Sequence, residues 1–243
     1  NALTLIDVSN PLFPILKSEI PQGLGPFDNL ESPTRLAFDG STLYLSAYGS
    51  NAVNIIDVSN PLMPALTATL KLNENGLTNF TTPQGLTIDN QILYVASLSP
   101  PTLSLFDVNT PSSPRLLRQI VQGTFGFDYL HGVQDPTIHG DTLYIPAQNS
   151  DAVTLVDISY PEEPRVFAQL VHEQGGFNHL NYPCQIQVAD DVLFILGYSS
   201  DAISFVRIDP TNTSGAVGLY VENRVGINTP LPRESLDVRG NAI

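Results

Sequence analysis

Leu3-Thr-Leu-Ile-Asp-Val-Ser-Asn-Pro11 is the stretch that decides the fold, because the same pattern returns at a fixed interval along the chain. The later copies are Val53-Asn-Ile-Ile-Asp-Val-Ser-Asn-Pro61, Leu103-Ser-Leu-Phe-Asp-Val-Asn-Thr-Pro111 and Val153-Thr-Leu-Val-Asp-Ile-Ser-Tyr-Pro161, each 50 positions after the one before. A fifth, decayed copy begins at Ile203 and has Arg207 in place of the aspartate. Self-similarity at a fixed period of this length indicates a repeat architecture.

Each period contains four short segments with the composition of β-strands. In the second period, residues 34–38 alternate and meet Asp39-Gly40, a dipeptide typical of hairpin turns, before residues 42–47. Residues 53–58 form the third segment, and residues 65–70 form the fourth after a proline-containing turn. No segment shows a sustained helical spacing of apolar residues. The sequence therefore predicts an all-β protein, a β-propeller of four to five four-stranded blades with an extended C-terminal tail.

The repeat also sets the expected domain boundaries. Residues 1–210 are predicted to form the propeller, with repeats that start near residues 1, 33, 83, 133 and 183, and residues 211–243 a C-terminal extension that is a candidate inter-subunit segment. The first copy contains only the third and fourth strands of a blade. Because unpaired strand edges need a partner, two arrangements stay open. Either the N-terminal strands complete the last sheet in the same molecule, or half-blades pair between molecules or with further parts of a longer polypeptide.

The composition argues against several classes of partner. Ten Lys and Arg stand against 24 Asp and Glu, so the formal net charge is -14 and the surface repels nucleic acid and anionic lipid. No apolar run is long enough to cross a membrane. The single cysteine, Cys184, cannot form an internal disulfide, and no Cys/His spacing indicates zinc. We expect no nucleic-acid partner, no membrane span and no cofactor.

The repeat resembles a known family. The pattern Ile-Ile-Asp-Val-Ser-Asn-Pro-x-x-Pro, with Leu-Tyr-Val-Ala before it in the repeat, is similar to the LVIVD-type propeller repeat of bacterial and archaeal surface proteins, over roughly residues 1–210. The resemblance implies a propeller at the cell surface or outside the cell. It implies no defined catalytic residues.

A second resemblance concerns the C-terminus. Residues 225–241 are similar to a motif of phage tail fibres and bacterial surface fibres, but Asn228 stands where glycine is usual. The alternative is a plain extended tail. If the fibre resemblance holds, the residues expected to contribute to assembly are Leu3, Leu5, Val217, Leu219, Val221, Val225, Ile227, Leu236 and Val238.

One aspartate recurs at the end of the third strand in four copies: Asp7, Asp57, Asp107 and Asp157. A ring of metal ligands is one interpretation of this recurrence. However, Asp followed by Ser or Asn and Pro is typical of tight turns, in which the carboxylate accepts hydrogen bonds from nearby amides. We therefore expect a structural role.

The long loops before each first strand are the predicted place for ligand binding, since loops on a rigid scaffold carry most functional sites. They span residues 21–33, 72–83, 122–135 and 172–183 and are expected to share a face with the turns between second and third strands. The candidate ligand-binding residues are Asp28, Asp128, Asn178, His131, His179 and Tyr182, with Asp28 and Asp128 as candidate calcium ligands. The alternative is that the Phe of each loop packs between blades and the Asp or Asn caps its own loop.

The function predicted from these features is an extracellular structural or interaction module. No catalytic motif is recognised, so the chain is predicted not to be an enzyme, with no catalytic residues and no metal site. The expected partners are further copies of the chain, in an oligomer or filament, and a glycan or surface protein. Two alternatives use the loop face of the axial channel: a propeller hydrolase, and a carbohydrate-binding lectin whose stacking surfaces are Tyr48, Tyr129, Tyr182 and Tyr198.

Overall fold

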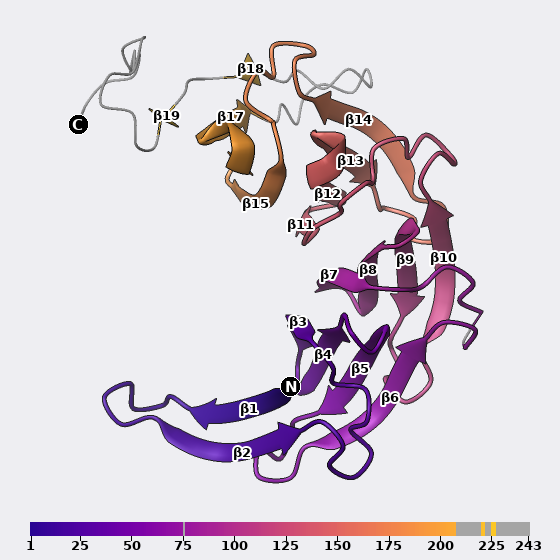
Figure 1. Ribbon diagram of the computed structural model, residues 1–243, viewed down its shortest axis with the longest axis vertical. Coiled ribbons are helices and arrows are strands. Elements are labelled where there is room, and N and C mark those ends of the chain that lie inside the picture. Colours follow the sequence, from indigo (N-terminus) through magenta and orange to yellow (C-terminus); the bar gives the residue numbers. More distant parts are fainter. Residues whose placement is uncertain (75, 208–219, 222–224, 227–243) are drawn as a thin grey trace. The chain divides into compact units, whose positions relative to one another are not determined.

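The computed structural model describes residues 1–207 except residue 75, together with residues 220–221 and 225–226 (Figure 1). These residues form two compact units: residues 1–124 with 160–163, and the remainder of the chain. The described residues are almost entirely antiparallel sheet, with two short 3₁₀ helices at Gln148–Ser150 (η1) and Tyr198–Ser200 (η2). The prediction of an all-β chain is confirmed.

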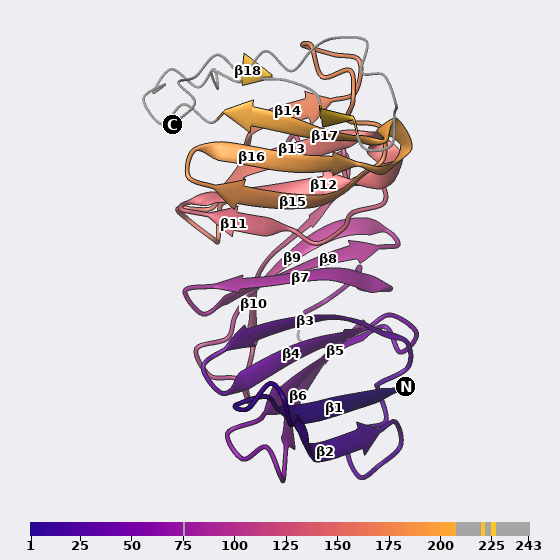
Figure 2. The same ribbon diagram turned by 90° about the vertical axis from the view of Figure 1, so that its left-hand side faces the viewer.

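The first unit contains one two-stranded and two four-stranded sheets, whose strands follow one another in chain order (Figure 2). The two-stranded sheet pairs β1 (Ala2–Asp7) with β2 (Ile15–Pro21). The next sheet consists of β3 (Pro33–Asp39), β4 (Thr42–Ala47), β5 (Ala52–Asp57) and β6 (Ala65–Lys71). The third consists of β7 (Pro83–Asp89), β8 (Ile92–Leu98), β9 (Pro101–Asp107) and β10 (Arg115–Val121).

The second unit contains two further sheets. One consists of β11 (Thr137–His139), β12 (Thr142–Ala147), β13 (Ala152–Asp157) and β14 (Arg165–Val171). The other consists of β15 (Pro183–Ala189), β16 (Val192–Gly197) and β17 (Ala202–Arg207), and the far edge of β17 pairs with both β18 (Tyr220–Val221) and β19 (Val225–Gly226). β18 and β19 thus occupy the position of a fourth strand in this last sheet.

Four-stranded antiparallel sheets that recur every 50 residues confirm the predicted β-propeller blades. In the second period, each strand lies within one residue at either end of the segment expected from the sequence. The prediction that the chain opens in mid-blade also agrees with the structure, since β1 and β2 correspond to β5 and β6.

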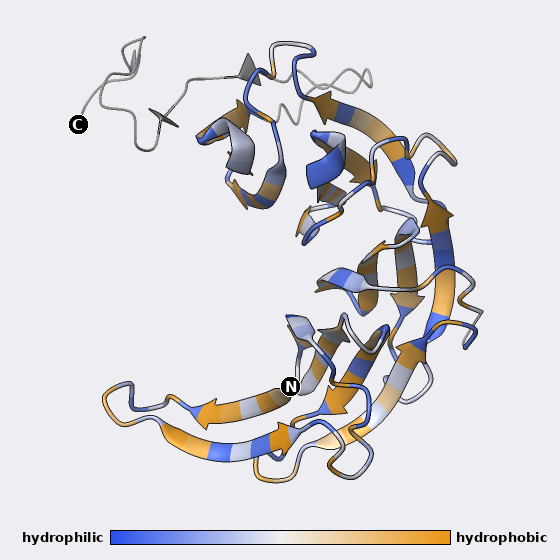
Figure 3. Cartoon of the chain, in the orientation of Figure 1, coloured by the Kyte–Doolittle hydropathy of each residue, from blue (hydrophilic) through white to orange (hydrophobic). Residues whose placement is uncertain are grey.

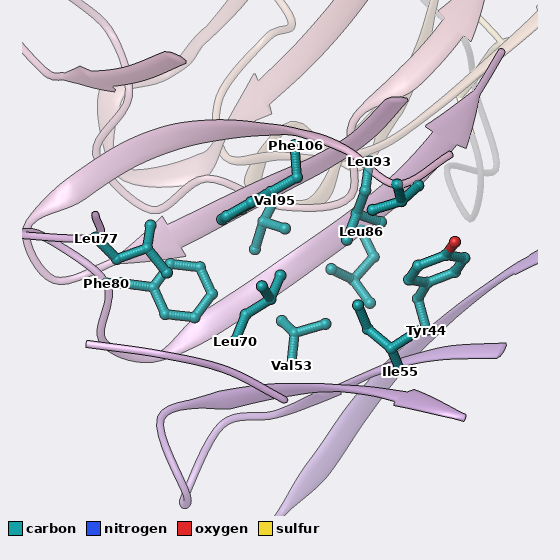
Figure 4. Close-up of a cluster of buried hydrophobic side chains, with 11 residues drawn as sticks. Tyr44, Val53, Ile55, Leu70, Leu77, Phe80, Leu86, Leu93, Val95 and Phe106 are labelled. Atoms are coloured by element: carbon teal, nitrogen blue, oxygen red, sulfur yellow. The ribbon is translucent and has the colours of Figure 1, made fainter. Parts of the chain in front are cut away.

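The core lies between the faces of neighbouring blades, and Figure 3 shows the apolar residues recurring along the strands. In the first unit, Val53, Ile55 and Leu70 of one blade meet Leu86, Val95 and Phe106 of the next (Figure 4). These side chains are 6% exposed or less. Burying one such side chain stabilises the fold by about 1.5–3 kcal/mol. The alternation of side chains along each strand therefore allows apolar residues to face both sides of a sheet.

The same packing recurs elsewhere in each unit. In the second unit, Val153, Leu155 and Leu170 of one blade pack with Ile186 and Ile195 of the next. In the first unit, the half-blade uses Leu3, which is buried, and Leu5 to pack against the blade that begins at β3. Both residues thus belong to the core of their own unit.

β11 is shorter than the equivalent strands β3, β7 and β15, because a proline stands opposite it. The carbonyl of Pro146 in β12 accepts a hydrogen bond from the amide of Gln134, so this side of Pro146 faces the first strand of the blade. Proline has no N–H to return. The ladder is therefore interrupted between the isolated bridge at Val133 and the start of β11 at Thr137.

Candidate functional site

The recurring aspartates cap their own turns. Asp7, Asp57, Asp107 and Asp157 each accept a hydrogen bond at Oδ1 from the amide two residues later, at 2.8–3.0 Å. At Asp7, the bond from the Ser9 amide, then the Ser9 hydroxyl and Lys17, lowers the pKa to about 2. The structure therefore assigns these residues to turn formation, as expected from the sequence.

The long loops bury their apolar residues and expose the polar residue between them. Phe27, Phe127 and Phe177 are buried, as are Leu30, Leu130 and Leu180. By contrast, Asp28, Asp128 and Asn178 are exposed. Asp28 lies in the first unit, whereas the other five candidate ligand-binding residues lie in the second. The apolar residues of these loops thus serve the core.

In two blades, a buried polar side chain in the third strand holds the long loop in place. Asn54 Nδ2 donates to the carbonyl of Asn29 at 2.6 Å, and Thr154 Oγ1 donates to the carbonyl of Tyr129 at 3.3 Å. Asn54 and Thr154 are fully buried. Because a buried polar group needs a partner, this bond fixes both the strand side chain and the loop backbone.

Each loop also pairs with the turn between the second and third strands of its own blade. The amides of Tyr48, Leu98, Gln148 and Tyr198 donate to the carbonyls of Ser32, Thr82, Gly132 and Tyr182, at 3.0–3.1 Å. The sequence predicted that these two kinds of segment share a face, and the hydrogen bonds confirm it within each blade. We call this pair of segments the loop face of a blade.

A further side chain connects the loop faces of successive blades. The Oδ1 atom of Asn1, Asn51 or Asp151 accepts a hydrogen bond at 2.7–3.0 Å from the backbone amide 31 residues later. The donors are Ser32, Thr82 and Tyr182, and all three have a positive φ, between 50° and 58°. This hydrogen bond requires a side-chain oxygen at the accepting residue and a left-handed backbone at the donating residue. It does not require a charge or an aromatic ring.

Unit 2 carries an aromatic pair at this position. The rings of Tyr182 and Tyr198 lie 5.8 Å apart between centroids, at an interplanar angle of 51°. Tyr198 is 71% exposed, while Tyr182 is half-buried. In the first unit, the corresponding residues are Ser32 and Tyr48, so the pair is particular to the last blade.

A carboxylate and an imidazole accompany this aromatic pair. The amide of His172 donates to the carbonyl of Asp151 at 2.9 Å, just as the amide of Gln22 donates to that of Asn1 at 3.0 Å. In the first copy, Asn1 Nδ2 also donates to Gln22 Oε1 at 2.9 Å. The repeat therefore places the side chains of residues 151 and 172 at positions that are in contact in the first copy.

The imidazole of His172 is mostly buried, and one of its nitrogens lacks a partner within the part of the chain that the structure describes. Its side chain is 19% exposed, and Nε2 lies 4.0 Å from Glu173 Oε1. Among the described residues, Nδ1 is buried and has no hydrogen-bond partner. A buried nitrogen in this state calls for an explanation, such as a bound water or a catalytic role. Sequence reasoning missed Asp151 and His172, although their departure from Asn1 and Gln22 was a visible signal.

The loop face of the second unit is acidic. Asp128, Asp151, Glu173 and Asp201 all lie in its loops and turns. The described residues of this unit include two arginines, Arg165 and Arg207. In the strand ladders they lie opposite Asp157 and Val192, at the ends of the strands away from the loop face. The charge of this face is thus negative over the part of the chain that the structure places.

The remaining candidate residues have structural contacts. His131 is exposed and donates its backbone amide to Ser150 Oγ at 3.0 Å. The carbonyl of His179 accepts a bond from Ser204 Oγ at 3.5 Å. Nowhere in residues 1–207 outside residue 75 do three residues of the metal-binding types gather as a metal site. Asp28 and Asp128, the candidate calcium ligands, belong to different units.

The residues expected to contribute to assembly fall into three groups. Leu3 and Leu5 pack in their own unit. Val221 and Val225 pair with β17 of the same chain. Val217, Leu219, Ile227, Leu236 and Val238 lie outside the described residues. An assembly role for these residues stays a prediction.

The comparisons with known proteins agree with the repeat. The pattern of the LVIVD repeat matches residues 1–20 and 44–71, so the chain contains LVIVD repeats. The resemblance of residues 225–241 to fibre proteins is not confirmed. A search of curated proteins gives no match. No helix in the described part of the chain has the length and apolar character needed to cross a membrane.

Several solved structures share the fold. The periplasmic gluconolactonase of Pseudomonas aeruginosa is 13% identical, with a TM-score of 0.70 over 93% of this chain and 64% of that one. A Bacteroides uniformis protein named as a candidate 6-phosphogluconolactonase is 11% identical, with a TM-score of 0.69 over 93% of this chain and 65% of that one. A chain of a nidogen/laminin complex is 14% identical, with a TM-score of 0.53 over 80% and 64% of the two chains. The chain therefore spans slightly less than two thirds of these lactonase-like structures.

These similarities correct one prediction. The absence of a recognised motif led us to predict that the chain is not an enzyme. That prediction is wrong as an inference from the fold, because structures named as lactonases have the same architecture over 93% of this chain. At identities of 11–13%, the likeness establishes the fold, and the chemistry has to be argued from this chain's own residues.

Proposed function

We propose that this chain is the catalytic part of an extracytoplasmic propeller hydrolase that opens a cyclic ester, at the loop face of the second unit. The observation that carries the proposal is a difference between two copies of the repeat. Where the first copy has Asn1 and Gln22, the fourth copy has Asp151 and His172. The scaffold is satisfied by the amide pair, so the carboxylate and imidazole are available for another purpose. The lactonase-like architecture, including that of a protein named as periplasmic, supports both the reaction class and the setting.

The proposed reaction needs a base, a water molecule and an ester. His172 takes a proton from water, and the water oxygen forms a bond to the carbonyl carbon of the ester. The ring C–O bond then breaks, and the proton passes to the ring oxygen, so that a hydroxy acid leaves. Asp151, whose carbonyl accepts the amide of His172 and whose Oδ1 accepts the amide of Tyr182, is proposed to stabilise the imidazolium by its negative charge.

The test is hydrolysis of a panel of sugar lactones and simple aliphatic lactones, followed by the acid released. We expect the wild-type chain to open at least one of them. His172→Gln should lower kcat by about 100-fold or more, the usual contribution of a general base. Asp151→Asn keeps an oxygen for the Tyr182 amide and should give a smaller loss, with a changed pH profile.

The matched control is His139→Gln. His139 is exposed at the hairpin between β11 and β12, at the end of the blade away from the loop face, and the same substitution there should leave kcat unchanged. No activity on any lactone, from a chain that is folded by circular dichroism, would contradict the proposed function. Equal losses in both histidine variants would remove the assignment of His172.

A further inference from the structure

The structure points to an uncharged, polyhydroxylated ring as the ligand of the second unit, and we propose that this ring stacks on Tyr198. This inference rests on the proposed function, because it names the substrate class of the same loop face. It is carried by the aromatic pair of Tyr182 and Tyr198 and by the charges of Asp151 and Asp201, and it does not depend on His172.

Tyr198 offers an exposed aromatic face in a fixed position. The residue is 71% exposed, yet its amide is held by the carbonyl of Tyr182 at 3.1 Å, and the centroid of its ring lies 5.8 Å from that of Tyr182. An aromatic ring that is supported on one side and open on the other presents apolar area at a low entropic cost. The C–H face of a sugar-type ring has the size and polarity to cover it.

Tyr182 is an unusual choice for its backbone position. It has φ of 58°, a left-handed conformation that costs a non-glycine residue roughly 1–2 kcal/mol. The equivalent residues, Ser32, Thr82 and Gly132, also have positive φ but carry small side chains. The large ring at Tyr182 therefore serves something other than the link between blades, and its visible contact is with Tyr198.

The charge around the pair selects against a phosphorylated ligand. Asp201 follows η2, which begins at Tyr198, and Asp151 binds the amide of Tyr182. Carboxylates accept hydrogen bonds from hydroxyl groups but repel a phosphate dianion. Arg165 and Arg207 lie at the other ends of their strands and do not offset this field. The chemistry of the face thus fits hydroxyl groups on a neutral ring.

The experiment measures binding and hydrolysis separately. Binding is followed by saturation-transfer NMR with methyl glycopyranosides, which have no ester to hydrolyse, and with glucose 6-phosphate. Hydrolysis is followed with D-glucono-1,5-lactone and its 6-phosphate. We expect the neutral members of both sets to be preferred. Tyr198→Ala should weaken binding and raise KM by about tenfold, close to the value of one aromatic contact, while Tyr198→Phe should retain both.

The control is Tyr48→Ala, which removes the exposed tyrosine at the equivalent position of the first unit and should change neither measurement. Hydrolysis that is unaffected by Tyr198→Ala, or a preference for the phosphorylated compounds, would overturn this inference and leave the proposed function standing. Glycoside binding that depends on Tyr198, without hydrolysis of any lactone, would support the binding site and exclude the hydrolase.

Discussion

The loop faces of the first and second units share the same backbone hydrogen bonds but carry different side chains. In the first unit, Asn1 accepts the amide of Ser32 and donates to Gln22. In the second unit, Asp151 accepts the amide of Tyr182 with the same geometry, and His172 occupies the position of Gln22. The backbone bonds are retained in both units, whereas the side chains change from two neutral amides and a hydroxyl to an acid, an imidazole and a phenol.

This difference separates the needs of the fold from additions to it. In a repeat protein, a residue type that every copy shares satisfies the backbone, as the turn aspartates do. A residue that departs from the shared type while keeping the shared bond is free to serve another purpose. Asp151 meets both conditions, because it retains the bond to the following blade and adds a charge.

The largest expected effect comes from opening a cavity in the core of one unit at a time. Leu70 and Leu170 are equivalent residues, exposed by 1% or less, in the first and second units. Substituting either by Ala should cost about 2–5 kcal/mol of unfolding free energy. If the site belongs to the second unit, Leu170→Ala should lower the urea concentration at which activity is lost more than Leu70→Ala does.

The measurement is lactone hydrolysis across a urea series, alongside circular dichroism. Equal shifts for the two variants would show that the units unfold together. A larger shift for Leu70→Ala would place the activity in the first unit and contradict the proposed site.

A smaller effect should come from the buried anchors of the loops. Asn54 Nδ2 binds the loop carbonyl at 2.6 Å in the first unit, and Thr154 Oγ1 binds its counterpart at 3.3 Å in the second. Asn54→Ala removes a short bond and leaves a buried carbonyl unpaired, which should cost about 1–3 kcal/mol. Thr154→Val keeps the volume and should cost less. Equilibrium urea unfolding monitored by circular dichroism checks the order, and the reverse order would contradict it.

The periodicity of the sequence was sufficient for the strands, the blades and the sharing of one face by two sets of loops. Each of these follows from local rules: alternation, turn dipeptides and a constant spacing. The shortening of β11 needed more, because the effect of Pro146 depends on which neighbour its missing N–H would face. Which neighbouring strand Pro146 faces depends on the register of the sheet, and the sequence of one strand does not reveal the register.

The sequence shows that Asp151 and His172 depart from Asn1 and Gln22, but not that these two positions are neighbours. The two residues are separated by a whole hairpin, and only the bond between Asn1 and Gln22 in the structure shows that their positions meet. The prediction that the chain is not an enzyme failed for a related reason. It relied on motifs that are continuous in the sequence, whereas side chains in a propeller meet across strands. The role of Tyr182 in ligand binding, expected from the sequence, stays a prediction.

The smallest expected effect concerns alkaline pH, where the two units differ by one phenol. Burial, and then the charge of Asp39, raises the pKa of Tyr44 to about 12. Burial likewise raises the pKa of Tyr94 and Tyr144, but the fourth copy has Phe194 at this position. A raised pKa means that folding favours the neutral phenol, so its contribution to stability is complete below the unfolded value of 10.0 and is lost as the pH rises toward 12.

Tyr44→Phe should therefore flatten the fall in stability of the first unit between about pH 10 and pH 12, with little change at neutral pH. The urea midpoint measured at several pH values checks this, and Tyr160→Phe, at a 77% exposed position, serves as the control. Because the first unit holds both Tyr44 and Tyr94 while the second holds only Tyr144, alkali should destabilise the first unit more. The proposed site lies in the second unit, which has fewer buried phenols. If activity were lost at a lower pH than the structure of the first unit, the expected order would be contradicted.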